Sequence, residues 1–178
     1  LLQPSRGRVL VGGEDLADTK AAAAAKARIG IVFQYPERQL FANTVFDDVA
    51  FGPRNLGLSG DEVEARVHES LSRVGLSIDD LREMSPFELS GGQQRRVAFA
   101  GVLAMNPEAL VLDEPVAGLD PVARREFLDL IAQLHKQGTT VVMVSHSMDD
   151  LAAMCDRVVV LKEGEIVRQG TPAHVFMH

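Results

Sequence analysis

"EALVLDEP", residues 108–115, decides the fold class, because four apolar residues lead directly into two carboxylates. A short run that is apolar at every position is typical of a strand buried on both faces of a parallel sheet. The runs "RIGIVFQ" (28–34) and "GTTVVMVSH" (138–146) have the same character. We therefore predict an α/β fold with a parallel-sheet core, in which Asp113 and Glu114 lie at the carboxyl end of a strand, where such sheets bind ligands.

The segment between the last two predicted strands has the pattern of a crossover helix. In "DPVARREFLDLIAQLHKQG" (120–138), Asp120 suits the N-cap, Pro121 the first helical position and Gly138 the C-terminal stop. Strand, helix and strand then form a βαβ unit. Beyond it, "DRVVVLKEGEIVRQG" (156–170) predicts a hairpin that turns at residues 162–164.

The middle of the chain differs in character, because it contains no strong strand pattern. In "SGDEVEARVHESLSRVG" (59–75), Ser59 and Glu62 form a potential capping box before a helical spacing of apolar residues. We predict that residues 36–105 form an α-helical insertion and that residues 1–35 and 106–178 form the α/β core.

Composition excludes several classes of protein. Eighteen Lys and Arg against 25 Asp and Glu give a net charge of -7, so we expect no general affinity for nucleic acid. The longest apolar runs, such as 141–144, are far shorter than the ~20 residues that span a bilayer, so any membrane role is expected to be peripheral. The single cysteine, Cys155, excludes an internal disulfide and fits the reducing cytosol.

The stretch "ELSGGQQRR" (88–96) predicts the start of a helix that can bind an anion. Ser90 can cap the helix and Gln93 can close a capping box, while Gly91 and Gly92 let backbone N–H groups approach a ligand. The alternative is a capped helix after a flexible turn. In that case the second glycine costs conformational entropy with no evident gain.

The acidic pair suits magnesium-dependent phosphoryl transfer. One carboxylate can hold Mg²⁺, and the next can polarise a water molecule for attack on phosphorus. His146 ends the neighbouring predicted strand, from where it could donate to a γ-phosphate or position that water. The plainer alternatives are an acidic pair that begins a solvated loop and a histidine beside a helix cap.

Five motifs together resemble those of ABC-type ATPases in order and spacing: the Q-loop, signature motif, Walker B motif, D-loop and switch histidine. They are Gln34, "LSGGQ" (89–93), "LVLDE" (110–114), "AGLD" (117–120) and His146. The resemblance covers essentially the whole chain. "YPERQLF" (35–41) and "SPFELSGG" (85–92) are similar, more narrowly, to the ATP-binding subunits of energy-coupling factor (ECF) transporters, which take up vitamins, cobalt or nickel.

The resemblance implies that the full protein is an ATPase, with ATP and Mg²⁺ as cofactors, and it implies roles for the matching residues. Asp113 would support Mg²⁺, and Glu114 would act as general base or position the water. His146 would contact the γ-phosphate. Gln34 would reach Mg²⁺ and the water, and would link the nucleotide state to the helical insertion.

The resemblance also implies a second ABC ATPase subunit, identical or homologous. Ser90, Gly91, Gly92 and Gln93 would bind the γ-phosphate of nucleotide held by that subunit, and Asp120 would couple the two sites. Further partners would be integral membrane scaffold and substrate-binding subunits. The chain would then lie peripherally on the cytoplasmic face of the cell membrane.

Two departures from the family pattern stand out. Val116 replaces a usual threonine beside the D-loop, which affects nothing essential. The 178 residues contain no G-x-x-x-x-G-K-[ST] phosphate loop, which in the family would fall just before Leu1. We therefore expect a fold that is incomplete at the N-terminus, and a fragment that binds ATP weakly and does not hydrolyse it, since acidic side chains alone repel a triphosphate.

One surface prediction leaves two alternatives open. Tyr35 and Pro36 end a strand, and Phe41, Phe46 and Phe51 follow closely. These rings either line a groove that receives a helix of a membrane subunit, as in the family, or pack the core of the insertion.

Two other functions remain as alternatives: a soluble ABC ATPase of DNA repair, translation or cluster assembly, and a non-catalytic dimerisation or regulatory fragment. Arg95 and Arg96 could contact nucleic acid in the first case. On an acidic chain, however, we expect them to form a solvated helix face.

Overall fold

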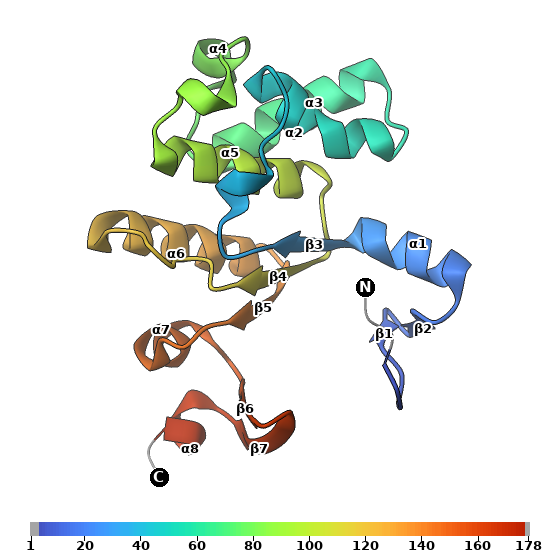
Figure 1. The fold of residues 1–178 in the computed structure, drawn as a ribbon, viewed down its shortest axis with the longest axis vertical. Helices are drawn as coiled ribbons and strands as arrows, with labels where there is room; N and C mark the ends of the chain where they lie inside the picture. The colour runs from blue at the N-terminus through green and yellow to red at the C-terminus, as the bar shows by residue number, and fades with distance from the viewer. Residues whose placement is uncertain (1–3, 177–178) are drawn as a thin grey trace. The chain divides into compact units, whose positions relative to one another are not determined.

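The computed structural model describes residues 4–176 and divides after Met143 into two units. Figure 1 traces the helices and strands along the chain. Within the described residues, no helix has both the length and the apolar character needed to cross a membrane.

A three-stranded sheet lies at the centre of the first unit. Its strands are β3 (Ile29–Val32), β4 (Ala109–Asp113) and β5 (Thr140–Val144), in the order β3-β4-β5. Strands β3 and β4 are parallel, with Ile29 opposite Ala109 and Val32 opposite Leu112. The predicted parallel-sheet core is confirmed.

Burial alternates along these strands. Val32, Leu110 and Leu112 are buried, whereas Ile31, between two buried residues, is 44% exposed. The prediction that the strands are buried on both faces is therefore wrong for this part of the chain. Val102 and Pro107 pack on the face that carries Gly30, whereas Ile31 points to the opposite face.

Gly30 determines how closely a helix approaches that face. A Cβ atom at this position would lie 2.5 Å from Cγ1 of Val102, on helix α5 (Gly91–Ala104), and 2.8 Å from Cδ2 of Leu110. Non-bonded contacts of Cβ atoms are essentially never this short, so only glycine allows α5 to pack this closely on β3.

Four helices and two short 3-10 helices lie between β3 and β4, in the upper part of Figure 1. They are η1 (Pro36–Gln39), α2 (Val45–Asn55), α3 (Gly60–Arg73), α4 (Ile78–Leu81), η2 (Pro86–Glu88) and α5. Helices α2, α3 and α5 pack on one another around fully buried Val49, Val67, Leu71 and Val97. The bounds of the predicted insertion, 36 and 105, stay a prediction.

The crossover helix is α6 (Pro121–Lys136), and it begins as the sequence predicts. The Asp120 carboxylate accepts hydrogen bonds from the N–H groups of Val122 and Ala123, at 2.9 and 3.1 Å. Phe127 and Ile131 face the core. Gly138 follows the helix at φ 101°, a conformation that favours glycine.

Before the sheet, strands β1 (Leu10–Val11) and β2 (Glu14–Asp15) form a small antiparallel pair, and helix α1 (Thr19–Arg28) leads into β3. Arg28 binds Glu108 through two hydrogen bonds, of 2.9 and 2.7 Å. This contact joins the end of α1 to the residue before β4, and it holds the pKa of Glu108 below its usual value.

The second unit contains α7 (Met148–Met154), β6 (Val158–Lys162), β7 (Glu165–Gly170) and α8 (Pro172–Phe176). Strands β6 and β7 form the predicted antiparallel hairpin. Its loop residues Glu163 and Gly164 have φ values of 54° and 83°, as a tight two-residue turn requires. Burial, and then Asp156, raises the pKa of the half-buried Cys155 thiol.

Candidate functional site

The start of α5 forms the capping box that the sequence predicts. The Ser90 hydroxyl accepts from the Gln93 N–H at 3.3 Å, and Gln93 Oε1 accepts from the Ser90 N–H at 3.1 Å. The same Oε1 accepts from the Ser90 hydroxyl at 3.0 Å. Ser90, Gly91 and Gly92 are exposed, so this helix start is open to a molecule approaching from outside.

The two glycines at this helix start have no packing role in the described chain. A Cβ atom at Gly91 or Gly92 would meet no atom within 4 Å, in contrast to the crowded Gly30. A helical glycine costs about 0.5–1 kcal/mol relative to alanine. Nothing within this part of the chain offsets that cost, which favours an external group that approaches the backbone closely.

The acidic pair lies where the sequence places it, at the end of β4. Asp113 is exposed and Glu114 is half-buried. Glu114 adopts φ 46°, a left-handed conformation that is uncommon outside glycine and is often found at functional sites. The exposed carboxylate of Asp113 is a hard oxygen donor and fits Mg²⁺, which proteins bind through one or two carboxylates together with phosphate oxygens.

A tight turn connects the acidic pair to α6. Val116 is buried, Gly118 has φ 75°, and Asp120 caps the helix. The observed role of Asp120 is therefore helix capping, and its coupling of two sites stays a prediction.

Arg95 is buried, which makes the predicted solvated helix face wrong at this position. The residue is 4% exposed, and its guanidinium donates to the backbone oxygens of Ala117 (3.0 Å), Gln34 (3.1 Å) and Pro115 (2.7 Å). Spacing along the helix could have revealed it, because Arg95 precedes buried Phe99 by four residues and shares its face.

Arg96, the next residue, is half-exposed. It donates to the Val74 oxygen at 3.0 Å and pairs with Glu126 at 2.5 Å. The prediction of a solvated helix face therefore fits Arg96 better than Arg95, although Arg96 also joins α5 to α3 and α6.

Gln34 and His146 come from different units. Gln34 follows β3 and is exposed, and its backbone oxygen accepts from Arg95, which also binds the segment after the acidic pair. His146 lies in the second unit, between β5 and α7, and is exposed. The predicted approach of His146 to Asp113 and Glu114 stays a prediction.

A groove of about 460 Å³ lies among α1, η1, α2 and α5. Phe41 and Phe51 line it, with ring centroids 4.8 Å apart and exposures of 58% and 50%. Asp48 shapes its rim, because its carboxylate accepts from the N–H groups of Phe41 (2.9 Å) and Ala42 (2.8 Å). These two phenylalanines therefore fit the groove alternative.

Phe46 does not line the groove. The guanidinium of Arg82 lies 4.0 Å from the centroid of its ring, and that of Arg54 lies 5.6 Å away. Arg54 also binds Asp47 at 2.9 Å, which holds the pKa of Asp47 below its usual value. For Phe46, packing within the helical region is the better description.

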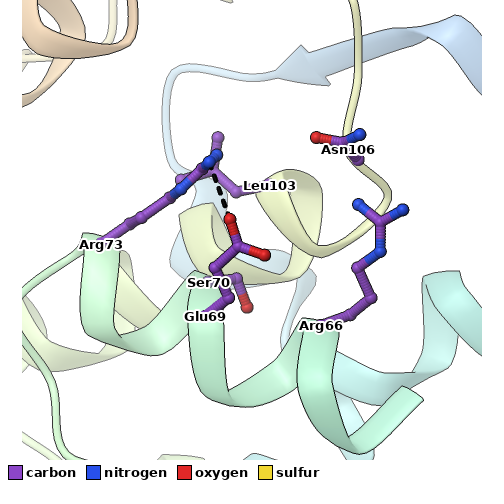
Figure 2. Close-up of a pocket in the computed structure, with 6 residues that line it drawn as sticks. All are labelled: Arg66, Glu69, Ser70, Arg73, Leu103 and Asn106. Atoms are coloured by element: carbon purple, nitrogen blue, oxygen red, sulfur yellow. Dashed lines mark ion pairs between the residues drawn. The ribbon is translucent and has the colours of Figure 1, made fainter. Parts of the chain in front are cut away.

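Figure 2 shows a second hollow, between α3 and the end of α5. Arg66, Glu69, Arg73 and Asn106 surround it, and Glu69 pairs with Arg73 at 2.8 Å. The volume open to a water-sized molecule in this hollow is about 0 Å³, so the hollow has no room for a ligand.

Comparison with known proteins gives a consistent result. The sequence matches the family described as "ABC transporter" over residues 1–117. A curated relative from Symbiobacterium thermophilum, "Energy-coupling factor transporter ATP-binding protein EcfA2", is 57% identical over 99% of this chain and 61% of its own length. A protein of the same name from Clostridium perfringens is 51% identical over 99% of this chain and 62% of its own length. The chain thus spans less than two thirds of these relatives.

Two solved structures share the fold. CbiO1 from Clostridium perfringens, described as part of the ABC transporter complex CbiONQ, has a TM-score of 0.88 and 41% identity over 99% of this chain and 70% of its own. The ATP-binding cassette MJ0796, a dimer in a post-hydrolysis state bound to ADP and Pi, has a TM-score of 0.79 and 30% identity over 96% of this chain and 75% of its own. These likenesses confirm the predicted α/β fold, and the chain belongs to the ABC transporter family.

Proposed function

We propose that this chain is part of the ATP-binding and ATP-hydrolysing subunit of an ECF-type importer of vitamins or transition-metal ions, driven by ATP-dependent closure of a dimer. The names of the relatives support the transporter class. The observation on which the proposal rests within the chain is the start of α5, where two exposed glycines have no packing role. A phosphate group of a nucleotide that is bound to a second subunit would explain these glycines.

On its own nucleotide, the chain would act through the end of β4 and the residues that follow β3 and β5. Asp113 would hold Mg²⁺ and Glu114 would polarise the attacking water, with Gln34 and His146 as additional contacts. Mg²⁺, when bound, would neutralise charge on the phosphates. The left-handed backbone of Glu114 supports this assignment, because strained conformations persist where function requires a particular direction of the side chain.

On the nucleotide of the second subunit, the chain would act through α5. The N–H groups at the first turn of a helix are unpaired donors and carry partial positive charge, so they attract phosphate. Gly91 and Gly92 leave those donors uncovered, and Ser90 and Gln93 add polar side chains beside them. Asp120 would couple the two sites.

Mixed dimers of two full-length copies test whether Glu114 and the helix start act at one site from different subunits. Gly92→Asp repels phosphate, yet it fits the open space and suits a first helical turn. In the proposal, each site combines Glu114 of one copy with Gly92 of the other. If one copy carries Glu114→Gln and the other carries Gly92→Asp, both substitutions fall in the same site, so the second site stays intact and ATP is hydrolysed. If one copy has both substitutions, neither site is intact and hydrolysis is lost. The reverse result would contradict action in trans.

The groove is proposed to receive an amphipathic helix of an integral membrane scaffold subunit, which would place the chain peripherally on the cytoplasmic face of the membrane. Exposed Phe41 and Phe51 support this, because paired aromatic rings in a hollow suit an apolar helix face. Phe51→Asp should abolish co-purification with the scaffold. Phe87→Asp is the matched control, since Phe87 is 61% exposed outside the groove.

For the polypeptide of residues 1–178 alone, we propose weak ATP binding and no hydrolysis. Its net charge is -7 and Asp113 is exposed, so it repels a triphosphate. The backbone donors and the lysine of a phosphate loop would be needed to make the electrostatic potential positive at the phosphates. Titration calorimetry with ATP and Mg²⁺ tests this, and tight binding would contradict it.

A further inference from the structure

We propose that Arg95 is a positioning residue: it ties the start of α5 to the backbone at Gln34 and to the segment 115–117, so that these three parts move together. The inference rests on the proposed function, in which the start of α5 contacts the partner's nucleotide while the other two parts flank the chain's own. Arg95 would then join the two half-sites of one subunit.

The geometry of Arg95 supports this directly. It lies in the second turn of α5, five residues after Ser90, and its guanidinium points away from solvent. Nη2 donates to the oxygens of Pro115 at 2.7 Å and Gln34 at 3.1 Å, and Nη1 donates to the oxygen of Ala117 at 3.0 Å. One rigid group therefore fixes two loops from different strands.

Only arginine suits this position. Its planar guanidinium presents several donors in fixed directions, whereas a lysine ammonium is a flexible point charge that cannot reproduce the same fork. Burial lowers the pKa of the Arg95 guanidinium, and Glu37, in η1 directly after the Gln34 segment, opposes part of that effect. The centroid of the Phe127 ring, on α6, lies 6.0 Å from the guanidinium carbon.

A consequence follows for the segment that connects the acidic pair with Asp120. Pro115 and Ala117 lie between Glu114 and Asp120, so their oxygens fix the path of the chain between those two side chains. A displacement of α5 would pull on this path and on Gln34 at the same time. A misplacement of about 1 Å near reacting groups can cost ~10²-fold in rate.

The test compares Arg95→Met with Val97→Ala in the full-length protein. Val97, on the same helix, is 0% exposed and takes no part in these hydrogen bonds, so its truncation reports loss of stability alone. For Arg95→Met we expect kcat for ATP hydrolysis to fall by about 10- to 100-fold with KM for ATP within about twofold. Val97→Ala, compared at equal fraction folded, should change neither. Equal effects of the two variants on kcat would overturn the proposal.

Two further measurements separate failure of this inference from failure of the proposed function. Amide hydrogen exchange should rise at residues 34–35 and 116–118 in Arg95→Met but not in Val97→Ala, and this readout needs no ATPase activity. Unchanged exchange would overturn the inference, whereas wild-type protein without ATPase activity would overturn the proposed function. If Arg95→Met does not fold, Arg95→Lys, which keeps the charge, should show the same exchange pattern.

Discussion

The Ser90 hydroxyl lies 3.0 Å from Oε1 of Gln93, so these two polar side chains at the start of α5 satisfy one another. Helix α3 begins in the same way, with the Ser59 hydroxyl 2.8 Å from Oε2 of Glu62. The two helix starts therefore share their local geometry, which makes each a control for the other.

Ser90→Ala and Ser59→Ala should cost similar stability and differ in activity. Loss of an N-cap hydroxyl costs about 0.5–2 kcal/mol, and we expect both variants to fall in that range in denaturant unfolding. Because Ser90 is proposed to contact phosphate, only Ser90→Ala should also lower ATP hydrolysis by the full-length protein. Equal activity of the two variants would argue that Ser90 is a helix cap and nothing more.

The glycines of α5 allow the opposite test, in which activity falls while stability rises. Gly92→Ala should stabilise the protein by up to about 1 kcal/mol, because a Cβ atom there meets nothing and alanine is the better helix former. ATP hydrolysis should fall, since the methyl group covers backbone donors. Gly60→Ala, in the first turn of α3 and equally open, should stabilise without loss of activity. A fully active Gly92→Ala variant would remove the main support for a phosphate at this helix start.

Local signals were sufficient to predict much of the fold. The capping boxes of α3 and α5, and Asp120 before Pro121, depend on residues within one helical turn, so the sequence shows them directly. The carboxylates at the end of β4 follow from a short apolar run.

The hydrogen-bond partners of Arg95 could not be predicted in the same way, because they lie 20, 22 and 61 residues away. Arg95 and Arg96 are identical neighbours, yet each helical residue is rotated by about 100° from the last, so one points inward and the other outward. The left-handed backbone of Glu114 also comes from tertiary structure, since glutamate has no local preference for it.

Asp47 and Asp48 are adjacent carboxylates on α2, and we expect them to contribute differently to stability and to scaffold binding. Asp48 accepts from two backbone N–H groups that position Phe41, so Asp48→Ala should cost about 1.5–3 kcal/mol and weaken co-purification with the scaffold subunit. Asp47 forms an exposed ion pair with Arg54, and Asp47→Ala should cost at most about 1 kcal/mol. Unfolding and co-purification of both variants check this, and equal results would show that Asp48 does not shape the groove.

Gly118 should be required for its backbone conformation and not for its size. It has φ 75°, and a Cβ atom would meet no atom within 4 Å, so a substitution introduces strain without a clash. A left-handed conformation costs about 1–2 kcal/mol for an ordinary residue, but asparagine adopts it more readily. Gly118→Ala should therefore destabilise the protein in thermal unfolding, and Gly118→Asn should recover much of the loss. Because the turn connects Glu114 to Asp120, we expect ATP hydrolysis to follow the same order; a destabilised yet fully active Gly118→Ala variant would show that the path of this turn does not matter for the chemistry.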